Sequence, residues 1–310
     1  MRVLPAPSTS APDHRAGFAS LIGRPNVGKS TLLNRLLGQK LAIVTPKPQT
    51  TRNRIRGIRT RPEGQVIYVD TPGLHPPRGK LGRFMASTVA QALKEVDVVI
   101  LVADATGPVD SPDTGVFEAL RPVVAPVVLA LNKVDLVGDK TKLLPRLQAY
   151  ADRCPFRALV PISAVTGTGV DRLAAVTLDL LPRGPALYPP GTVTDQPETF
   201  FVAETIREQL LLAVRQEVPY ACAVRVDELT ERGPDAPLYI RGEIFVERPS
   251  QKGIVIGEGG AMLKRVGQAA RRELEAFFGV RVFLDLRVRV RRDWRQDDRA
   301  LRELGYQRTS

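Results

Sequence analysis

A glycine-rich segment of eight residues, Gly23–Ser30, limits the fold of this chain more than any other feature. The segment reads GRPNVGKS and fits the pattern G-x-x-x-x-G-K-[ST], in which backbone N–H groups surround phosphate oxygens. The apolar run 17–22 before it is typical of a buried strand, and residues 31–37 after it have the spacing of an apolar-faced helix. This order predicts an α/β domain with a phosphate-binding P-loop rather than a chance match on a glycine turn.

The loop residues and the one that follows are candidate phosphate contacts. They are Gly23, Arg24, Pro25, Asn26, Val27, Gly28, Lys29, Ser30 and Thr31. Lys29 is expected to reach the β- and γ-phosphates of a nucleotide, and the Ser30 hydroxyl to occupy one position around Mg²⁺. The N-terminus of the following helix adds a dipole that favours phosphate charge. The sequence therefore predicts a nucleotide site here.

A second motif follows an apolar strand pattern at residues 66–69. It is Asp70-Thr71-Pro72-Gly73. A carboxylate at the end of a buried strand holds phosphate-bound Mg²⁺ through water, and a glycine N–H after it can contact the γ-phosphate. We therefore expect Asp70 and Gly73 to act directly on the phosphates.

Two later motifs predict which base is bound. They are Asn132-Lys133-Val134-Asp135 and Ser163-Ala164, each after an apolar run. The Asp135 carboxylate can accept from two N–H donors of guanine, a pair that adenine lacks. Asn132 is expected to tie its loop to the P-loop, and the Lys133 stem to cover the base. A backbone N–H of Ser163-Ala164 would contact the guanine carbonyl. The four motifs in this order predict a site for GTP and GDP, not an ATP-dependent kinase.

Residues 16–182 alternate predicted strands with predicted helices. Strands are expected near 17–22, 54–60, 65–70, 97–103, 126–131 and 157–162, and helices near 29–37, 81–95, 111–120, 140–151 and 168–180. This alternation predicts a doubly wound, mostly parallel sheet with helices on both faces. We expect residues 1–15 to be a disordered tail, and the Pro- and Gly-rich residues 183–198 to be a flexible linker.

Residues 199–310 predict a smaller α+β domain with a basic C-terminal tail. The expected order is helix, strand, strand, helix, helix and strand, over 199–215, 222–227, 238–246, 250–256, 261–278 and 280–290. The two central helices are joined by Gly257-Glu258-Gly259-Gly260, which fits the GXXG loop that clamps a single-stranded RNA backbone in KH domains. A plain helix–helix turn is the alternative. The predicted RNA contacts are Lys252, Gly257, Glu258, Gly259, Gly260, Lys264 and Arg265.

These motifs together resemble a known family. Residues 17–181 are similar to the translation-factor-type class of P-loop GTPases, and Gln49-Thr50-Thr51-Arg52 is close to its ribosome-assembly and tRNA-modification branch. A P-loop GTPase followed by one KH domain resembles the Era family of bacterial GTPases over nearly the whole chain. Residues 47–52, 246–252 and 294–306 are also close to that family's pattern.

The resemblance implies a GTP-hydrolysing switch that binds near the 3′ end of small-subunit rRNA and assists small ribosomal subunit maturation. It also implies peripheral contact with the cytoplasmic face of the inner membrane. The implied catalytic residues are Lys29, Thr51, Asp70 and Gly73, and the implied Mg²⁺ ligands are Ser30, Thr51 and Asp70. Thr51 is preferred to Thr50 because it directly precedes Arg52, as in the related motif.

Two positions bear on how fast such an enzyme works. Leu74 stands where the signalling GTPases place a glutamine that positions the attacking water, so intrinsic hydrolysis is expected to be slow. Asn26 matches an asparagine that related GTPases use to hold K⁺, and capping of the loop is the alternative role. His75 is interpreted as a solvated switch residue rather than a catalytic one.

Composition agrees with a two-domain protein of 310 residues, 43% of them hydrophobic. No apolar run approaches the length of a membrane span, and the two cysteines fall in different predicted domains, so we expect a cytoplasmic protein without a disulfide. We also expect it to be a monomer. The net charge of +12 is concentrated in residues 1–60, at +10, and 261–310, at +6. These basic regions, including Lys40–Arg59, point to polyanion partners unless they are only solvated surface. A tRNA-modification GTPase and an RNA-binding scaffold with a vestigial pocket are the alternative functions.

Overall fold

The computed structural model describes residues 13–107, 114–214, 218–233 and 235–306. Contacts divide the chain into two compact units. The first contains the chain up to Leu41, Arg54–His75 and Val89–Asp195, and the second contains Ala42–Asn53, Pro76–Thr88 and the chain from Gln196. Most of the predicted disordered tail, residues 1–12, lies outside the described residues, as do residues 111–113 and 307–310. Two short N-terminal segments thus belong with the C-terminal unit.

The elements of the first unit follow the predicted alternation closely. The strands are β1 (Arg15–Ile22), β2 (Ile55–Arg61), β3 (Gly64–Asp70), β4 (Val98–Asp104), β5 (Val127–Asn132) and β6 (Ala158–Pro161). The α-helices are α1 (Lys29–Leu37), α3 (Thr114–Leu120), α4 (Leu143–Ala151) and α5 (Val170–Leu180), and the short 3₁₀ helices are η1 (Val134–Leu136) and η2 (Lys140–Lys142). Helix α2 (Gly79–Lys94) begins in the second unit and ends in the first.

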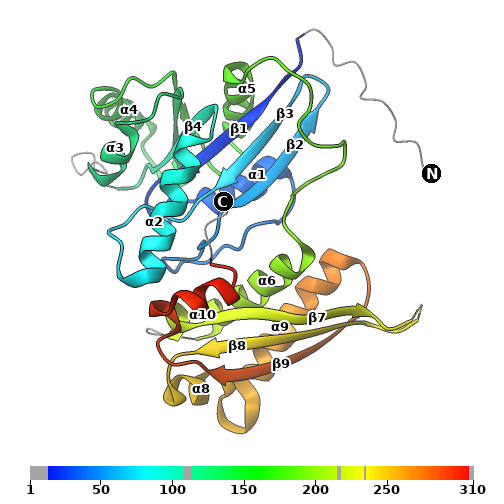
Figure 1. Cartoon of the computed structure of the whole chain (residues 1–310). Coiled ribbons are helices and arrows are strands. Elements are labelled where there is room, and N and C mark those ends of the chain that lie inside the picture. The colour runs from blue at the N-terminus through cyan, green and yellow to red at the C-terminus, as the bar shows by residue number, and fades with distance from the viewer. Residues whose placement is uncertain (1–12, 108–113, 215–217, 234, 307–310) are drawn as a thin grey trace. The chain divides into compact units, whose positions relative to one another are not determined.

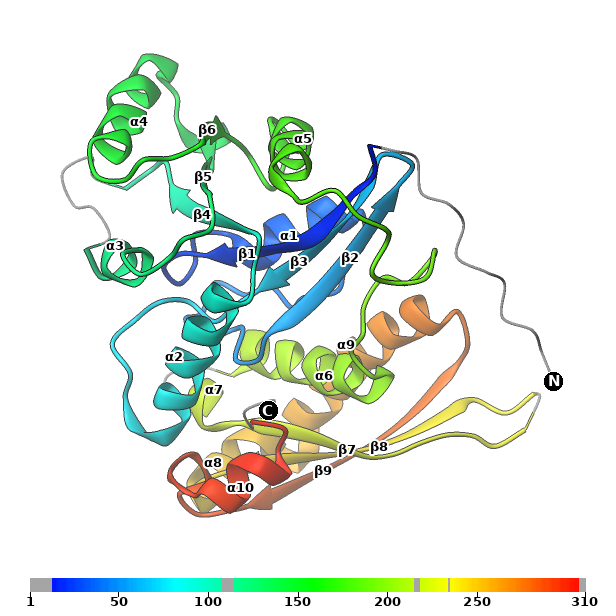
Figure 2. The ribbon, with the colours of Figure 1, turned by 45° about the horizontal axis from the view of Figure 1, so that its top comes forward.

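The first unit is built on a sheet with the strand order β2-β3-β1-β4-β5-β6. Among these strands β2 pairs antiparallel with β3, and the other neighbours are parallel. The central strands are buried along nearly their whole length because helices cover both faces. Figures 1 and 2 show α1 and α5 on one side of the sheet and α3 and α4 on the other. The prediction of a doubly wound, mostly parallel sheet is confirmed.

The region predicted as a flexible linker is bonded along the edge of this sheet. The side chain of Gln65 donates to Tyr188 O (2.9 Å) and accepts from the Leu187 N–H (2.8 Å). The Ile58 N–H donates to Val193 O (2.7 Å), which covers the exposed edge of β2. Arg15, assigned to the predicted tail, is the first residue of β1. Residues 187–195 are therefore an ordered part of the first unit, because backbone groups of an edge strand need partners.

The second unit contains the predicted α+β order and, within the described residues, four further short elements. Its α-helices are α6 (Glu198–Ala213), α7 (Val218–Ala221), α8 (Pro249–Ile256), α9 (Ala261–Phe278) and α10 (Asp298–Glu303). Its strands are β7 (Ala223–Glu231), β8 (Leu238–Val246) and β9 (Val282–Val290), and its 3₁₀ helices are η3 (Glu258–Gly260) and η4 (Trp294–Gln296). Helices α7 and α10 and the 3₁₀ helices η3 and η4 were not predicted, and η3 lies within the predicted Gly257–Gly260 loop.

The sheet of the second unit has the order β7-β8-β9. Strand β8 pairs antiparallel with β7 and parallel with β9. Val202 and Ile206 of α6 and Val266 and Leu274 of α9 form a buried cluster with apolar strand residues such as Ile240. This packing buries the apolar faces of both helices on the sheet.

A second apolar cluster of this unit explains why Pro76–Thr88 belongs to it. Leu81 and Met85, from the start of α2, pack with the fully buried Trp294 and with Leu301 and Tyr306. The Trp294 indole N–H donates to Ala221 O (2.9 Å). Residues 291–306 are thus folded against the unit rather than extending as a tail. No helix within the described ranges is long and apolar enough to cross a membrane.

Candidate functional site

The P-loop connects β1 to α1 and has the backbone of a tight turn. Gly23, Asn26 and Gly28 have φ angles of 147°, 62° and 100°. A Cβ atom at Gly28 would lie 2.3 Å from Nδ2 of Asn132, so only glycine fits at this approach. Arg24 and Asn26 are exposed at the tip of the turn, and Thr31 is half-buried in α1. The loop therefore has the curvature that its pattern predicts.

Lys29, the first residue of α1, is held over the loop. Its Nζ donates to Gly23 O (3.2 Å) and to Arg24 O (2.8 Å). Burial lowers the pKa of Lys29 to about 8, and the nearby charge of Asp70 opposes that shift. A bound phosphate would stabilise the ammonium form, so this lysine is placed to respond to an anion.

Ser30 and Asp70 lie together beside the P-loop. The Ser30 hydroxyl donates to Oδ2 of Asp70 (2.7 Å), and Asp70 is fully buried at the end of β3. The Thr71 hydroxyl donates to Leu21 O (2.8 Å), which fixes the start of the next loop on β1. A hydroxyl and a carboxylate are ligands that Mg²⁺ prefers, so these residues fit the ion that accompanies a nucleotide. The described residues contain no cluster of three or more His, Cys, Asp or Glu side chains that could hold a metal ion.

Thr51, the third predicted Mg²⁺ ligand, belongs to the second unit, where it is buried. Of the predicted metal ligands, Ser30 and Asp70 share the first unit and form a direct contact. The role of Thr51 therefore stays a prediction.

The loop after Asp70 packs directly on the P-loop. A Cβ atom at Gly73 would lie 2.8 Å from the backbone N of Pro25, and the Leu74 N–H donates to Gly23 O (3.0 Å). The Leu74 side chain packs against an apolar cluster of the sheet, so it cannot orient a water molecule. His75 is partly buried rather than solvated, and its Nε2 has no hydrogen-bond partner among the described residues.

Asn132 links three loops of the site. Its Nδ2 donates to Val27 O (2.8 Å) in the P-loop, and its Oδ1 accepts from the Ala164 N–H (2.9 Å). Asn132 is buried at the end of β5, so both contacts are shielded from water. The predicted tie between this loop and the P-loop is present.

Lys133 and Asp135 follow Asn132 in a strained turn. Lys133 has a φ of 68°, and its Nζ lies 2.6 Å from Oδ2 of Asp104. Burial raises the pKa of Asp104, but hydrogen bonds from Lys133 and Thr106 outweigh it and lower the pKa overall. Asp135 lies in η1 with its side chain exposed, so its carboxylate can reach a ligand.

The Ser163-Ala164 loop differs from the prediction in its donors. The Ser163 N–H donates to Thr168 O (2.9 Å) and the Ala164 N–H donates to Asn132, so both are engaged within the protein. A guanine carbonyl would have to share one of these two N–H groups with its present acceptor, Thr168 O or Asn132 Oδ1. Arg35, which the sequence analysis missed, donates from Nε to Ala164 O (3.1 Å) and from Nη2 to Val165 O. Its place in the last turn of the P-loop helix was the available signal.

Arg52 is a buried anchor rather than part of a free basic surface. Its side chain is 1% exposed. Its guanidinium donates to the carbonyls of Cys222 (2.8 Å) and Tyr220 (3.1 Å) and lies near the rings of Trp294 and Tyr306. Arg52 therefore belongs neither to the predicted polyanion-binding surface nor to a solvated basic one, because its guanidinium donates inside the second unit.

Residues of α6 and its C-terminal end bind the segment that contains Arg52, Ala42–Asn53, which we call the switch segment. Glu208 accepts from the Val44 N–H (2.8 Å), and Arg207 donates to Thr50 O while paired with Glu204. The Lys47 ammonium donates to two carbonyls at the end of α6. Every one of these contacts lies within the second unit, so the segment is docked on the α+β domain.

The Gly257–Gly260 loop has the backbone that only glycine adopts easily. Gly257, Gly259 and Gly260 have φ angles of 73°, 55° and 82°. A Cβ atom at Gly259 would meet no atom within 4 Å, so the main chain there is open to a ligand. Glu258, Lys264 and Arg265 are exposed, and Lys252 is half-buried in α8.

A groove of about 470 Å³ lies beside this loop, between α9 and β9. Leu263, Gly267 and Leu286 line its floor, and Lys264 and Arg271 supply positive charge. Phe283 also lines it with its side chain 55% exposed. Gln268, Arg271 and Phe283 were missed by the sequence analysis, because the groove depends on how β9 packs beside α9.

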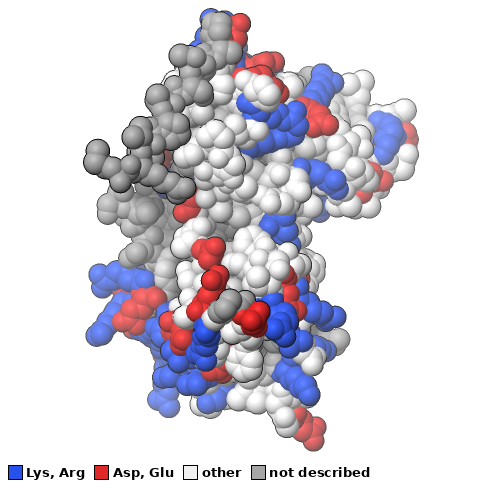
Figure 3. All heavy atoms as spheres, turned by 90° about the vertical axis from the view of Figure 1, so that its right-hand side faces the viewer, with Lys and Arg blue, Asp and Glu red and all other residues white. Residues whose placement is uncertain are grey.

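Much of the positive charge of the second unit is already paired. Figure 3 shows blue and red side chains intermixed on one face. Arg289 lies 2.5 Å from Glu243, Arg291 lies 2.7 Å from Glu303, and Arg287 lies 3.2 Å from Asp285. Net charge therefore overstated the free basic surface near the C-terminus.

The fold and the loops define a guanine-nucleotide-binding P-loop domain joined to a domain with the KH arrangement. A family model described as 50S ribosome-binding GTPase matches residues 18–133, and a KH domain model matches residues 217–295. The chain is 50% identical over 292 residues to GTPase Era of Geobacter metallireducens, covering 94% of this chain and 98% of the relative. GTPase Era of Geotalea uraniireducens is 48% identical, with the same coverage.

Two solved structures are similar over the same extent. A single-residue variant of Aquifex aeolicus Era bound to GDP·AlF4⁻ has a TM-score of 0.90 and 38% identity, covering 94% of this chain and 99% of the other. Era in complex with MgGDPNP and nucleotides 1506–1542 of 16S rRNA has a TM-score of 0.91 and 39% identity, with the same coverage. The chain belongs to the Era family of GTPases, and the predictions of a GTPase and of a KH domain are confirmed.

Proposed function

We propose that this GTPase is a molecular switch that binds near the 3′ end of small-subunit rRNA under control of its nucleotide. The observation that best supports this proposal is the groove beside Gly257–Gly260. The chain is also similar, over 94% of its length, to an Era structure that contains RNA. The glycines let a phosphate backbone approach the main chain, and the exposed Lys264 supplies charge. The exposed ring of Phe283 offers a surface on which a base can stack.

For hydrolysis, we infer that Lys29, Thr51, Asp70 and Gly73 act on the phosphates. Lys29 neutralises the β- and γ-phosphates, and the Gly73 N–H donates to the γ-phosphate. Ser30, Thr51 and Asp70 hold the Mg²⁺ that neutralises the charge of the nucleotide. The MgGDPNP complex of the similar Era supports this assignment.

Slow intrinsic hydrolysis follows from Leu74, whose side chain faces the core instead of the phosphates. A K⁺ ion beside Asn26, at the exposed tip of the P-loop, would neutralise the negative charge that develops on the phosphates during hydrolysis. Faster turnover in KCl than in NaCl at equal ionic strength would support this role for Asn26.

We infer that the guanine base is bound by the loops that follow β5 and β6. The exposed Asp135 carboxylate accepts from guanine, and the Lys133 stem, fixed by Asp104, covers one face of the ring. Asn132 and Arg35 hold the loops around it. Ser163 or Ala164 meets the guanine carbonyl by sharing a donor.

Coupling would pass through the switch segment. Thr51 is needed at Mg²⁺ in the GTP state, yet its neighbours Thr50 and Arg52 are bonded to α6 and α7 of the second unit. A γ-phosphate that attracts Thr51 therefore acts on the second unit through the same few residues. We infer that RNA binds the Gly257–Gly260 loop more tightly in the GTP state.

In the cell, this activity would assist assembly of the small ribosomal subunit. We propose that the protein works as a monomer in the cytoplasm, with peripheral contact to the cytoplasmic face of the inner membrane. The similar complex with 16S rRNA supports the ribosomal part of this proposal.

The decisive experiment is RNA affinity in two nucleotide states. A labelled oligonucleotide with the sequence of the 16S rRNA 3′ end is titrated with the full chain, in GDP and in a non-hydrolysable GTP analogue, at one salt concentration. Tighter binding with the analogue supports the switch. Equal affinities would leave two independent modules, and chemical change of the RNA would favour a modification enzyme.

Replacing Glu258 and Gly259 by aspartates tests the RNA site. The new charge should repel the phosphate backbone and abolish binding, while basal GTP hydrolysis stays nearly intact. The matched control is Gly115→Asp, which adds the same charge on α3, where a Cβ atom meets nothing within 4 Å. Loss of binding in the control as well would assign the effect to net charge.

A further inference from the structure

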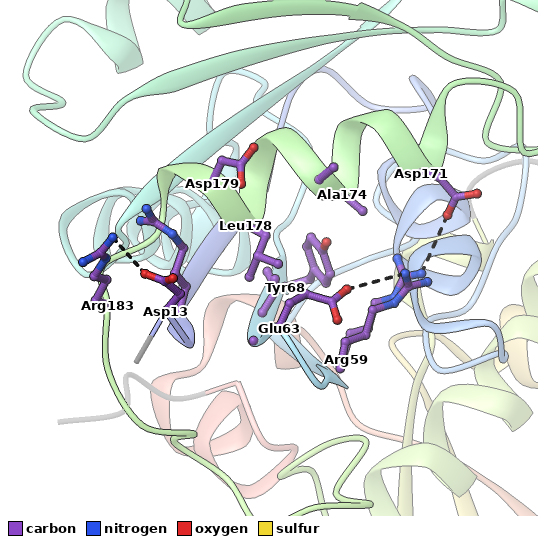
Figure 4. A pocket seen from close by; sticks show the side chains of 14 residues that line it. Asp13, Arg59, Glu63, Tyr68, Asp171, Ala174, Leu178, Asp179 and Arg183 are labelled. Atoms are coloured by element: carbon purple, nitrogen blue, oxygen red, sulfur yellow. Dashed lines mark ion pairs between the residues drawn. The ribbon is translucent and has the colours of Figure 1, made fainter. Parts of the chain in front are cut away.

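The first unit contains a cavity that lies away from the P-loop. Its volume is about 550 Å³, and it is bounded by the amino ends of β1 and β3, by β2 and by α5. Figure 4 shows its side chains converging between these strands and the helix. The P-loop follows the opposite end of β1, roughly 20 Å away at 3.3 Å per residue. The cavity is therefore separate from the nucleotide site.

Tyr68 and Arg59 form the deep part of this cavity. Tyr68 is fully buried on β3, its hydroxyl donates to no acceptor among the described residues, and the Arg59 guanidinium lies beside that hydroxyl. Burial raises the pKa of Tyr68 to about 12 against the opposing charge of Arg59. The hydroxyl therefore keeps its proton at neutral pH and can donate it to an acceptor.

Arg59 is a poorly neutralised cation. Its side chain is 18% exposed, and Asp171, its ion-pair partner, is 3.8 Å away with its own side chain 92% exposed. Water screens so exposed a carboxylate, so the pair is weak. A ligand with a single negative charge could therefore form a closer ion pair with Arg59 than Asp171 does.

The mouth of the cavity has a different character. Asp13 is paired with Arg183 at 2.9 Å and Glu63 with Arg61 at 3.9 Å, and all of these side chains are at least half exposed. Asp171 also lines the cavity, so the carboxylates and arginines around it largely cancel each other's charge. A lining of balanced charge gives little attraction for a nucleic acid or a polyphosphate, and Arg59 leaves one cationic group for a small anion.

We propose that this cavity binds a small organic carboxylate with an apolar body. The carboxylate accepts from the Arg59 guanidinium and the Tyr68 hydroxyl, in the paired geometry that arginine offers to carboxylates. The apolar body lies against Val66 of β3 and Ala174 and Leu178 of α5. The volume is within the range of about 300–1,000 Å³ for small-molecule sites.

The test is calorimetric titration of the full GDP-bound chain with three probes that share a phenyl group. 4-Phenylbutyrate should bind with one saturable site, and 4-phenylbutan-1-ol at least about tenfold more weakly, since it lacks the charge. Phenyl phosphate, a dianion, should also bind more weakly than phenylbutyrate. Equal binding of the alcohol, tighter binding of phenyl phosphate, or no saturable binding of phenylbutyrate would overturn the proposal.

Two variants place the bound probe. Tyr68→Phe should weaken phenylbutyrate binding about fivefold through loss of one hydrogen bond, and Arg59→Gln at least about tenfold. The matched controls are Tyr188→Phe and Arg61→Gln, the latter on the same strand at the rim, and both should leave affinity within about twofold. Unchanged GTP hydrolysis in all four shows that the unit is folded. Unchanged probe affinity in both test variants would overturn the proposal.

Discussion

At the scale of single residues, the proposed guanine site combines buried positioning groups with exposed groups that can reach a ligand. Asn132 is buried and joins the P-loop to the Ala164 loop through its two amide atoms. Asp135 is exposed on η1 and contributes nothing to the core. We therefore expect substitution of Asn132 to disturb the proposed guanine site, and substitution of Asp135 to change which base that site accepts.

Asp135→Asn should reverse part of the base preference. The amide offers a donor where guanine also donates, so GTP should bind about 100-fold more weakly and xanthosine triphosphate more tightly. Competition binding of the two nucleotides measures this. Asp152→Asn, an exposed position at the end of α4, is the matched control and should change neither. GTP binding as tight as in the parent would show that Asp135 does not contact the base.

Lys29 should take up a proton when GTP binds at alkaline pH. Its pKa is about 8 in the free protein, so at pH 8.5 about three quarters of the molecules carry a neutral amine, and phosphate raises the pKa again. Calorimetry in two buffers of different ionisation enthalpy should report uptake of about 0.7 proton at pH 8.5 and little at pH 6.5. Lys29→Arg, which stays charged, should lose this uptake. Equal uptake in that variant would assign the proton to another group.

At the scale of elements, the switch segment is the piece with the most unexpected placement. Backbone carbonyls of the second unit accept from Lys47 and Arg52, and Arg207 donates back to Thr50. Such contacts are local and specific, so a single side chain should control whether the segment stays docked.

Arg52→Gln should release the switch segment. A shorter neutral side chain leaves the carbonyls of Cys222 and Tyr220 short of donors, at about 2–3 kcal/mol of unfolding free energy. Hydrogen exchange of Ala42–Asn53 should rise, and urea unfolding should move to lower concentration. Arg54→Gln, whose partner Glu95 is half exposed, should cost less than about 1 kcal/mol. Unchanged exchange in Arg52→Gln would show that other contacts hold the segment.

At the scale of the whole molecule, two units share segments of one chain. The switch segment and the start of α2 leave the first unit in sequence, join the second, and return. Both connect directly to nucleotide-site motifs, because one follows α1 and the other follows the Asp70–Gly73 loop. At both places the chain therefore connects a nucleotide-site motif directly to a segment of the second unit.

Linkage requires the coupling to be reciprocal. If the GTP analogue tightens RNA binding by some factor relative to GDP, RNA should tighten the analogue over GDP by the same factor. Nucleotide affinities measured with and without the oligonucleotide at fixed salt test this. Arg207→Gln, which removes the contact to Thr50, should reduce the factor toward one, whereas Arg302→Gln on α10 should leave it unchanged. Unequal factors in the parent protein would mean that the measurements are not at equilibrium with one RNA site.

The sequence by itself determined the order of the elements, the P-loop and guanine motifs, and the GXXG loop. Those features depend on local periodicity and on residues close together in the chain, as with Gly28 and Lys29 beside one helix start. Only the tertiary structure decided that Arg52 is buried, that residues 187–195 cover an edge strand, and that Phe283 opens into the groove. It also brought Tyr68 and Arg59 together under α5. The physical reason is the same in each case, because burial and hydrogen-bond partners depend on segments that are distant in sequence.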